Sequence, residues 1–244
     1  MISLRLLVIA LLLSAKPGQP HAPVPSDGTT NPAAGEIHGK IAISPAREAM
    51  DSHTRANLLG RYVGHGSEES AFLVVPPAAN TYKLSERAVV YLEGTDLDRQ
   101  QYQLPSRNPA LDQKNLQFHP QVLPILVGTT VDFPNRDNLF HNVFSYSDAK
   151  DFDLGRYPKD DSRSVTFDKP GVVRVYCDIH SNMSATILVL RQPYFAAPDD
   201  GGNYVIRNVP PGKYRIILWY DRDAVEHRTI EVPADSSVEV NFTY

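Results

Sequence analysis

The sequence predicts an all-β protein built from β-sandwiches. From Glu36 onward the apolar residues recur mostly with a period of two, in short runs rich in β-branched and aromatic residues. Turn residues separate these runs, and the 20 prolines and 14 glycines of the 244-residue chain provide many tight turns. Many short strands divided by turns are typical of sandwiches.

The N-terminus has the pattern of an export signal. It carries a positive charge at Arg5 and an unbroken apolar run over Leu6–Leu13. This run is shorter than the ~20 residues of a bilayer-spanning helix, so it fits a cleaved secretory signal better than an anchor or a buried strand. We expect a signal peptide over 1–22, cleaved after Ala15 or Ala22. The mature chain is then expected to have no membrane span and to be periplasmic or secreted from a bacterial cell.

A linker and a series of strands are expected after the signal. Segment 23–35 is rich in Pro, Gly, Ser and Thr, which is typical of a flexible linker. One helix is expected over Pro45–Tyr62, with Ser44 as its N-cap. The expected strands are Ile37–Ile43, Phe72–Val75, Ala88–Leu92, Val122–Val127, Thr130–Phe133, Asn142–Tyr146, Ser164–Phe167, Val172–Tyr176, Ala185–Leu190, Tyr204–Val209, Lys213–Tyr220, Arg228–Val232 and Val238–Phe242.

Charge and cysteine content exclude some classes of function. The 24 Lys and Arg residues are outnumbered by 28 Asp and Glu residues, which gives a net charge of −4. Nucleic acid is therefore not an expected partner, because phosphate binding needs a basic face. The single cysteine cannot form an intramolecular disulfide.

The lone cysteine opens a short motif of potential metal ligands. Cys177, His180 and Met183 form a Cys-x2-His-x2-Met pattern directly after an apolar run, and His141 precedes another strand upstream. Two imidazoles, a thiolate and a weak axial thioether form the type of site that selects copper for electron transfer. Zinc is the main rival metal, although it prefers a hard or thiolate ligand over Met183. A metal-free interpretation, with Cys177 as a small buried hydrophobe, stays open.

Four segments around this motif carry a family resemblance: Gln117–Pro120, Val127–Asp137, Phe140–Val143 and Gly171–Cys177. They resemble the strands and ligand segments of the cupredoxins, small type 1 blue copper domains with a Greek-key β-sandwich. The two-residue gap between the second histidine and the methionine is similar to the short ligand loop of amicyanins, whereas plastocyanins have a longer loop. The chain also resembles secreted bacterial proteins labelled methylamine-utilisation proteins.

The resemblance implies a role for each residue of the motif. One copper ion would be bound by three equatorial ligands, His141, Cys177 and His180. Met183 would be its axial ligand. Asn142 matches an asparagine whose side chain ties the two ligand segments together. Asp178 stands where the family commonly has a hydroxyl residue. We expect its carboxylate to accept a hydrogen bond from the Asn142 amide and to lower the copper potential.

The resemblance also implies a docking surface. In the family the second histidine is the more exposed ligand, and electrons pass through its edge. Four side chains are expected to surround His180 with apolar surface: Leu139, Phe140, Ile179 and Met183. Phe140 is equally consistent with a core position. Such a surface suits transient docking of a redox partner, of the dehydrogenase or cytochrome c type.

No enzymatic activity is expected. Copper oxidases and nitrite reductases commonly carry histidines beside the cysteine, whereas Tyr176 and Asp178 flank Cys177 here. The expected function is a periplasmic, mononuclear type 1 copper protein that carries one electron between partners. The alternative is a copper-binding protein for delivery, storage or sensing.

The C-terminal part has a second, different resemblance. Residues Asp199–Trp219 contain a Gly201-Gly202 turn and a Pro210–Gly212 turn between alternating strands. This pattern resembles the carboxypeptidase-regulatory-like, transthyretin-like sandwich. Two early segments, Glu36–Ile41 and Arg87–Glu93, look like the first strands of that fold.

Neither the early nor the late fragment has enough strands to bury both faces of a sheet alone. We therefore expect them to pair across the chain, with the copper domain inserted between them. The expected division is 36–98 for the first part of the regulatory-like sandwich, 112–191 for the cupredoxin domain and 192–244 for the second part.

Overall fold

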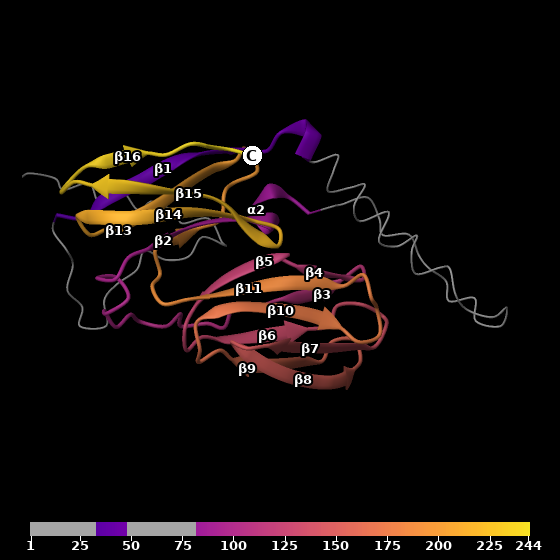
Figure 1. Cartoon of the computed structure of the whole chain (residues 1–244). Coiled ribbons are helices and arrows are strands. Elements are labelled where there is room, and N and C mark those ends of the chain that lie inside the picture. Colours follow the sequence, from indigo (N-terminus) through magenta and orange to yellow (C-terminus); the bar gives the residue numbers. More distant parts are fainter. Residues whose placement is uncertain (1–32, 48–81) are drawn as a thin grey trace, which may run out of the picture.

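The computed structural model describes residues 33–47 and 82–244 (Figure 1). This part of the chain consists almost entirely of strands, so the all-β prediction is confirmed. The strands form two sandwiches, each with its own hydrophobic core. The central sandwich comprises the strands within residues 112–190, and the flanking sandwich comprises strands from both sides of that range.

The central sandwich has two layers. One is a five-stranded sheet with the order β5 (Val122–Leu126), β11 (Ser184–Leu190), β10 (Gly171–Cys177), β7 (His141–Ser147) and β8 (Lys150–Tyr157). The other layer pairs β3 (Asp112–Lys114) with β4 (Gln117–His119) and β6 (Thr130–Pro134) with β9 (Ser162–Thr166). Two isolated bridges connect these pairs of strands. Gln113 of β3 pairs with Asn135, the residue after β6, and Ala110, just before β3, pairs with Asp132 of β6.

Strand alternation directs the side chain of Cys177 into this core. Val173, Val175 and Cys177 of β10 are buried, whereas Arg174 and Tyr176 between them lie on the other face and are only partly buried. The Cys177 sulfur therefore lies at the end of an apolar core.

The flanking sandwich draws its strands from both ends of the described chain. In one sheet β1 (Gly35–Ala42) pairs antiparallel with β13 (Asn203–Val209) and parallel with β16 (Ser237–Glu239) and β17 (Phe242–Thr243). The other sheet has the order β12 (Phe195–Ala196), β2 (Ala88–Glu93), β14 (Gly212–Tyr220) and β15 (Asp223–Val232). Strands that precede the central sandwich thus pair with strands that follow it, while the exact domain boundaries stay a prediction.

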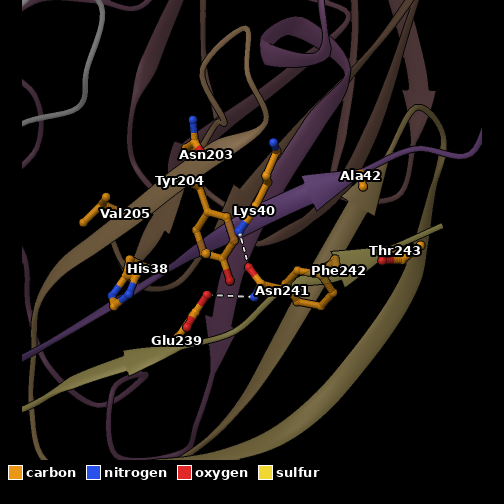
Figure 2. Close-up of a pocket in the computed structure, with 11 residues that line it drawn as sticks. His38, Lys40, Ala42, Asn203, Tyr204, Val205, Glu239, Asn241, Phe242 and Thr243 are labelled. Atoms are coloured by element: carbon orange, nitrogen blue, oxygen red, sulfur yellow. Dashed lines mark hydrogen bonds between the residues drawn. The ribbon is translucent and has the colours of Figure 1, made fainter.

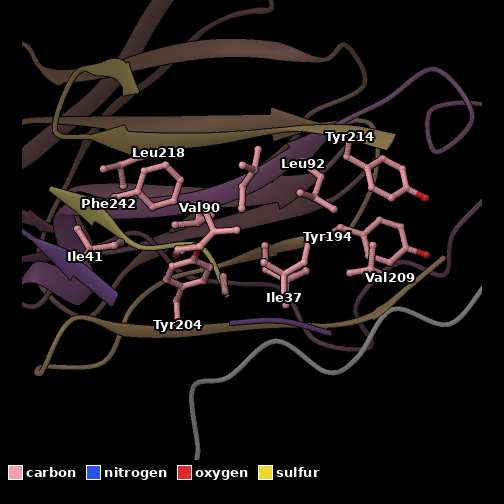
Figure 3. Packing of buried hydrophobic residues seen from close by; sticks show 14 of the residues in the cluster. Ile37, Ile41, Val90, Leu92, Tyr194, Tyr204, Val209, Tyr214, Leu218 and Phe242 are labelled. Atoms are coloured by element: carbon pink, nitrogen blue, oxygen red, sulfur yellow. Dashed lines mark hydrogen bonds between the residues drawn. The ribbon is translucent and has the colours of Figure 1, made fainter. Parts of the chain in front are cut away.

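The core of the flanking sandwich joins these two sheets (Figure 3). Ile37 of β1 packs in the same cluster as Val90 and Leu92 of β2, and all three are fully buried. Tyr214, Ile216 and Leu218, which alternate along one face of β14, are also buried, and so is Trp219 on the opposite face.

The opposite face of β14 is buried because the two sandwiches pack against each other. Val89 of β2 and Ile217 and Trp219 of β14 form one cluster with Val122 of β5 and Leu188 of β11. We call this cluster the seam. It holds the five-stranded sheet of the central sandwich against the flanking sandwich.

Some elements differ from the expected ones. The strand expected over Val238–Phe242 is divided into β16 and β17, and four strands that were not expected are present: β3, β4, β8 and β12. A short helix, α2 (Leu84–Arg87), precedes β2. The strand expected over Phe72–Val75 lies outside the described residues, as does most of the helix expected over Pro45–Tyr62. The described residues include no helix long and apolar enough to cross a membrane.

The break between β16 and β17 results from a close approach of two backbones. A Cβ atom on Gly39 would lie 1.8 Å from the carbonyl oxygen of Val240, so only glycine fits at this position of β1. Figure 2 shows the groove beside the break. There the backbone N–H of Lys40 donates to Oδ1 of Asn241 at 2.7 Å, and the side-chain NH2 of Asn241 donates to Oε1 of Glu239 at 2.9 Å. The first bond satisfies a backbone N–H group of β1 beside the interrupted ladder, and the second orients the Asn241 side chain that accepts it.

Replacing Gly39 with Ala should therefore destabilise the protein. Overpacking of this kind costs about 1–3 kcal/mol, because β1 and the β16–β17 segment must move apart. Thermal unfolding followed by circular dichroism measures the effect. Lys40→Ala, an exposed change on the same strand, is the control and should stay within about 0.5 kcal/mol. Equal melting temperatures for the two variants would contradict the close-approach explanation.

Candidate metal centre

Two adjacent strands bring the expected ligands together. His141 is the first residue of β7, and Cys177 is the last residue of β10. These strands pair antiparallel, with Cys177 opposite Val143, so the start of one lies beside the end of the other. The chain then turns through residues 178–183 and returns as β11, which brings His180 to the same place.

Three side-chain atoms converge there. The Cys177 sulfur lies 3.8 Å from Nδ1 of His141 and 3.6 Å from Nδ1 of His180, and the two nitrogens are 3.0 Å apart. His141 is fully buried, Cys177 is buried and His180 is partly exposed. Within the described residues, this is the group of three or more His, Cys, Asp or Glu side chains whose ligand atoms lie close enough to share a metal ion.

The separations of the three atoms fit trigonal coordination of a metal ion. Nitrogen and sulfur ligands about 2.0–2.3 Å from one metal, spread at equal angles in a plane, lie ~3.5–3.7 Å from one another. Both sulfur–nitrogen separations are close to that value, and the nitrogen–nitrogen separation is shorter. The donors themselves, one thiolate and two imidazoles, suit a soft ion such as copper.

Met183 completes the loop after the cysteine. Its side chain is 1% exposed and belongs to the same core cluster as Cys177. The Met183 amide donates to the His180 carbonyl at 3.0 Å, and its own carbonyl accepts from the Cys177 amide at 3.3 Å. The loop is thereby closed on itself. The axial role of the Met183 sulfur stays a prediction.

The surroundings favour an ionised thiol. Burial acts to raise the pKa of Cys177, but the hydrogen bond with His141 and those from backbone amides outweigh it, so the thiol pKa lies below its ordinary value. For His141, burial acts to lower the pKa, and hydrogen bonds with Cys177 and Asp137 raise it above the ordinary value. His180 has a lowered pKa because of burial and the neighbouring His141. A thiolate and a neutral imidazole are the forms that bind a metal.

One residue at the site was not anticipated. Oδ2 of Asp137 lies 3.1 Å from Nε2 of His141, and the same carboxylate accepts hydrogen bonds from the amides of Asn115 and Leu116. Burial acts to raise the pKa of Asp137, but these amide hydrogen bonds and His141 outweigh it and hold the pKa below the ordinary value. The sequence signal that could have indicated Asp137 is its position four residues before His141.

The expected pairing of Asn142 with the Asp178 carboxylate is wrong. The Asn142 amide donates to Oδ1 of Asp153 at 2.8 Å instead. The reason is strand alternation: His141 points into the site, so the next side chain of β7 points to the opposite face, toward β8. Asp178 is exposed, and its backbone amide donates to the Asn142 carbonyl at 3.0 Å. These two residues still connect the ligand segments, but through the backbone.

Apolar side chains lie next to the site in the chain and face solvent. Leu139 is 49% exposed, Phe140 is 57% exposed and Ile179 is 38% exposed. Phe140 is therefore on the surface and not in the core. Met183, which was expected beside these residues, is buried in the core and adds nothing to this surface.

A family comparison agrees with this geometry. Residues 107–190 match the family described as copper binding proteins, plastocyanin/azurin family. This part of the chain is a cupredoxin domain. The cofactor of that domain is copper, in agreement with the donor set at the end of its core. No curated protein matches the chain.

Solved structures similar to the chain include a nitrite reductase, an amicyanin and a cupredoxin. A copper-containing nitrite reductase from Thermus scotoductus SA-01 has 28% identity over 38% of this chain and 24% of its own, with a TM-score of 0.34. A reduced mutant of amicyanin has 22% identity over 36% of this chain and 87% of its own, with a TM-score of 0.33. A purple cupredoxin from Nitrosopumilus maritimus has 24% identity over 34% of this chain and 100% of its own, with a TM-score of 0.31.

Replacing Met183 with Leu tests its role as the axial ligand. The two side chains have similar volumes, so the fold should be retained at a cost below about 1.5 kcal/mol. Loss of a weak sulfur donor should destabilise Cu(II) more than Cu(I) and raise the reduction potential of the copper-loaded protein, as measured by voltammetry. Ile187→Leu, a buried change in the same core, is the control. If neither variant shifts the potential, Met183 is not a ligand.

Proposed function

We propose that this protein is a mononuclear type 1 copper protein that carries one electron at a time between redox partners outside the cytoplasm. The observation that carries the proposal is the convergence of one thiol and two imidazoles at the end of an apolar core, with one imidazole partly exposed. Bound copper supplies the one-electron couple. The proposed ligands are His141, Cys177, His180 and Met183.

The chain holds these ligands in a rigid frame. Cys177 is fixed by its place in β10, and His141 by its place in β7. The intervening loop is closed by backbone hydrogen bonds, including Asp178 to Asn142 and Met183 to His180. A frame that moves little when the metal changes charge is what fast electron transfer needs. Rigidity and burial favour a carrier over the flexible sites expected of delivery, storage or sensing proteins.

The partly exposed His180 is the proposed exit for the electron. Ile179 precedes it in the chain, and Leu139 and Phe140 precede His141, whose Nδ1 lies 3.0 Å from Nδ1 of His180. All three side chains are exposed and offer apolar surface for a short-lived complex. The proposed partner is a redox protein of the dehydrogenase or cytochrome c type. This role needs no substrate pocket, and we propose that the protein is not an enzyme.

Two further proposals follow from the sequence. Residues 1–22, which lie outside the described residues, are proposed as a cleaved export signal, which places the mature protein in the periplasm or the medium. The flanking sandwich, assembled from 36–98 and 192–244 around the copper domain, is proposed as a scaffold or docking surface.

The visible spectrum of the mature protein after addition of one equivalent of Cu(II) tests the copper centre. We expect an intense blue band that ascorbate bleaches and oxidation restores with the metal retained. Cys177→Ser should abolish the band, because the band requires a bond between the thiolate and copper. A colourless protein that still binds copper or zinc would favour delivery, storage or a zinc site. Absence of binding would leave a structural role.

Electron self-exchange between copies of the protein tests the docking surface without a known partner. Leu139→Lys places like charges at the surface that two copies must bring together, so the exchange rate measured by NMR should fall about tenfold, or ~1.4 kcal/mol. Leu104→Lys is a matched control, because Leu104 is also 49% exposed and packs near Gly128, far along the sheets from the ligand loop. Equal rates for the two variants would exclude this surface as the exit.

A further inference from the structure

The carboxylate of Asp137 is surrounded by hydrogen-bond donors. Oδ1 accepts from the Asn115 amide at 2.7 Å, and Oδ2 accepts from the Leu116 amide at 2.9 Å. Oδ2 also lies 3.1 Å from Nε2 of His141. The Asp137 side chain is 12% exposed, and the His141 side chain is not exposed at all.

This arrangement requires a carboxylate. Both oxygens of Asp137 face N–H groups of the backbone, so an asparagine amide in either orientation would bring its NH2 group against a donor. Because both of its oxygens accept from backbone N–H groups, the Asp137 side chain is stabilised in its ionised form, which has no proton to donate. His141 must then be the donor in the contact between Nε2 and Oδ2.

The tautomer of His141 follows from that contact. With the proton on Nε2, a neutral imidazole keeps Nδ1 free as an acceptor or ligand. Nδ1 is the atom that faces the Cys177 sulfur and Nδ1 of His180. Asp137 thus fixes which nitrogen of His141 is available to the metal and in which direction its lone pair points.

A separate turn holds Asp137 in place. Asn115 and Leu116 form the turn between β3 and β4, and both have positive φ values, 56° and 58°. Leucine rarely adopts this conformation, so the turn needs compensating contacts. Asp137 supplies two of them, and the Asn182 amide from the ligand loop donates to the Leu116 carbonyl at 3.3 Å. One turn therefore connects the segment of His141 with the loop that contains His180.

We propose that Asp137 is a positioning residue for the copper centre, which orients His141 and lowers the reduction potential through the charge that it places on the far side of the imidazole. The β3–β4 turn is the part of the fold that fixes this carboxylate. This inference rests on the proposed function, because it requires copper at the site. A negatively charged hydrogen-bond acceptor at Nε2 makes Nδ1 of the imidazole a stronger electron-pair donor to the metal. This stabilises Cu(II) more than Cu(I).

Asp137→Asn tests the proposal. Loss of such a partner typically weakens metal binding about 10–100-fold, and we expect a loss in that range for Cu(II) with a smaller loss for Cu(I). Each tenfold difference between the two losses raises the potential by about 59 mV for one electron. Competition titrations give both affinities, and voltammetry gives the potential.

Asp178→Asn is the matched control. It removes the same charge from the residue beside Cys177, but the Asp178 side chain is exposed and its carboxylate does not contact either histidine. Solvent screens an exposed charge strongly, so the shift in potential should be clearly smaller than for Asp137→Asn. If the two variants shift the potential equally, or neither shifts it, the proposal is overturned.

A measurement on the unaltered protein covers the case in which Asp137→Asn does not fold. In the metal-free protein, at a pH where the imidazole is neutral, nitrogen–proton NMR correlations should place the His141 proton on Nε2. A proton on Nδ1 would overturn the proposal. Failure of the unaltered protein to form a blue copper centre would instead refute the proposed function, so the two failures are distinguishable.

Discussion

The antiparallel pairing of β7 with β10 is the constraint on which the metal centre depends. A metal ion needs ligands from distant parts of the chain at nearly fixed separations. Here the hydrogen-bonded register places Cys177 opposite Val143, two residues beyond His141. The core on one side of the sheet then shields both side chains from water. A one-residue slip of either strand would turn its proposed ligand to the opposite face.

The convergence of Cys177 and His180 could be predicted because the candidate ligand motif is local in the sequence. Cys177, His180 and Met183 lie within seven residues, and their donor types alone favour copper. The position of Asp137 could not be predicted in the same way, because its meaning depends on amides of a third segment, the turn at Asn115 and Leu116. The four-residue spacing between Asp137 and His141 is visible in the sequence, but it gives no sign that amides of another segment fix the carboxylate.

Other differences have equally specific causes. The pairing of Asn142 with Asp178 was inferred from the family resemblance, whereas strand alternation sends the Asn142 side chain toward Asp153. Strand β8 was not expected because charged residues alternate with its apolar ones, as suits the edge of a sheet. The division between β16 and β17 depends on the missing side chain of Gly39, which a propensity pattern does not register.

The seam contains an intrinsic fluorophore. Its single tryptophan, Trp219, is 5% exposed there, and the guanidinium of Arg174 lies 5.5 Å from the centre of its ring. Arg174 belongs to β10, the strand that ends in Cys177. Intrinsic fluorescence therefore reports on one defined place, where the two sandwiches meet. Separation of the sandwiches would shift the emission to longer wavelength without any added dye, and a loss of metal that left the seam intact would not.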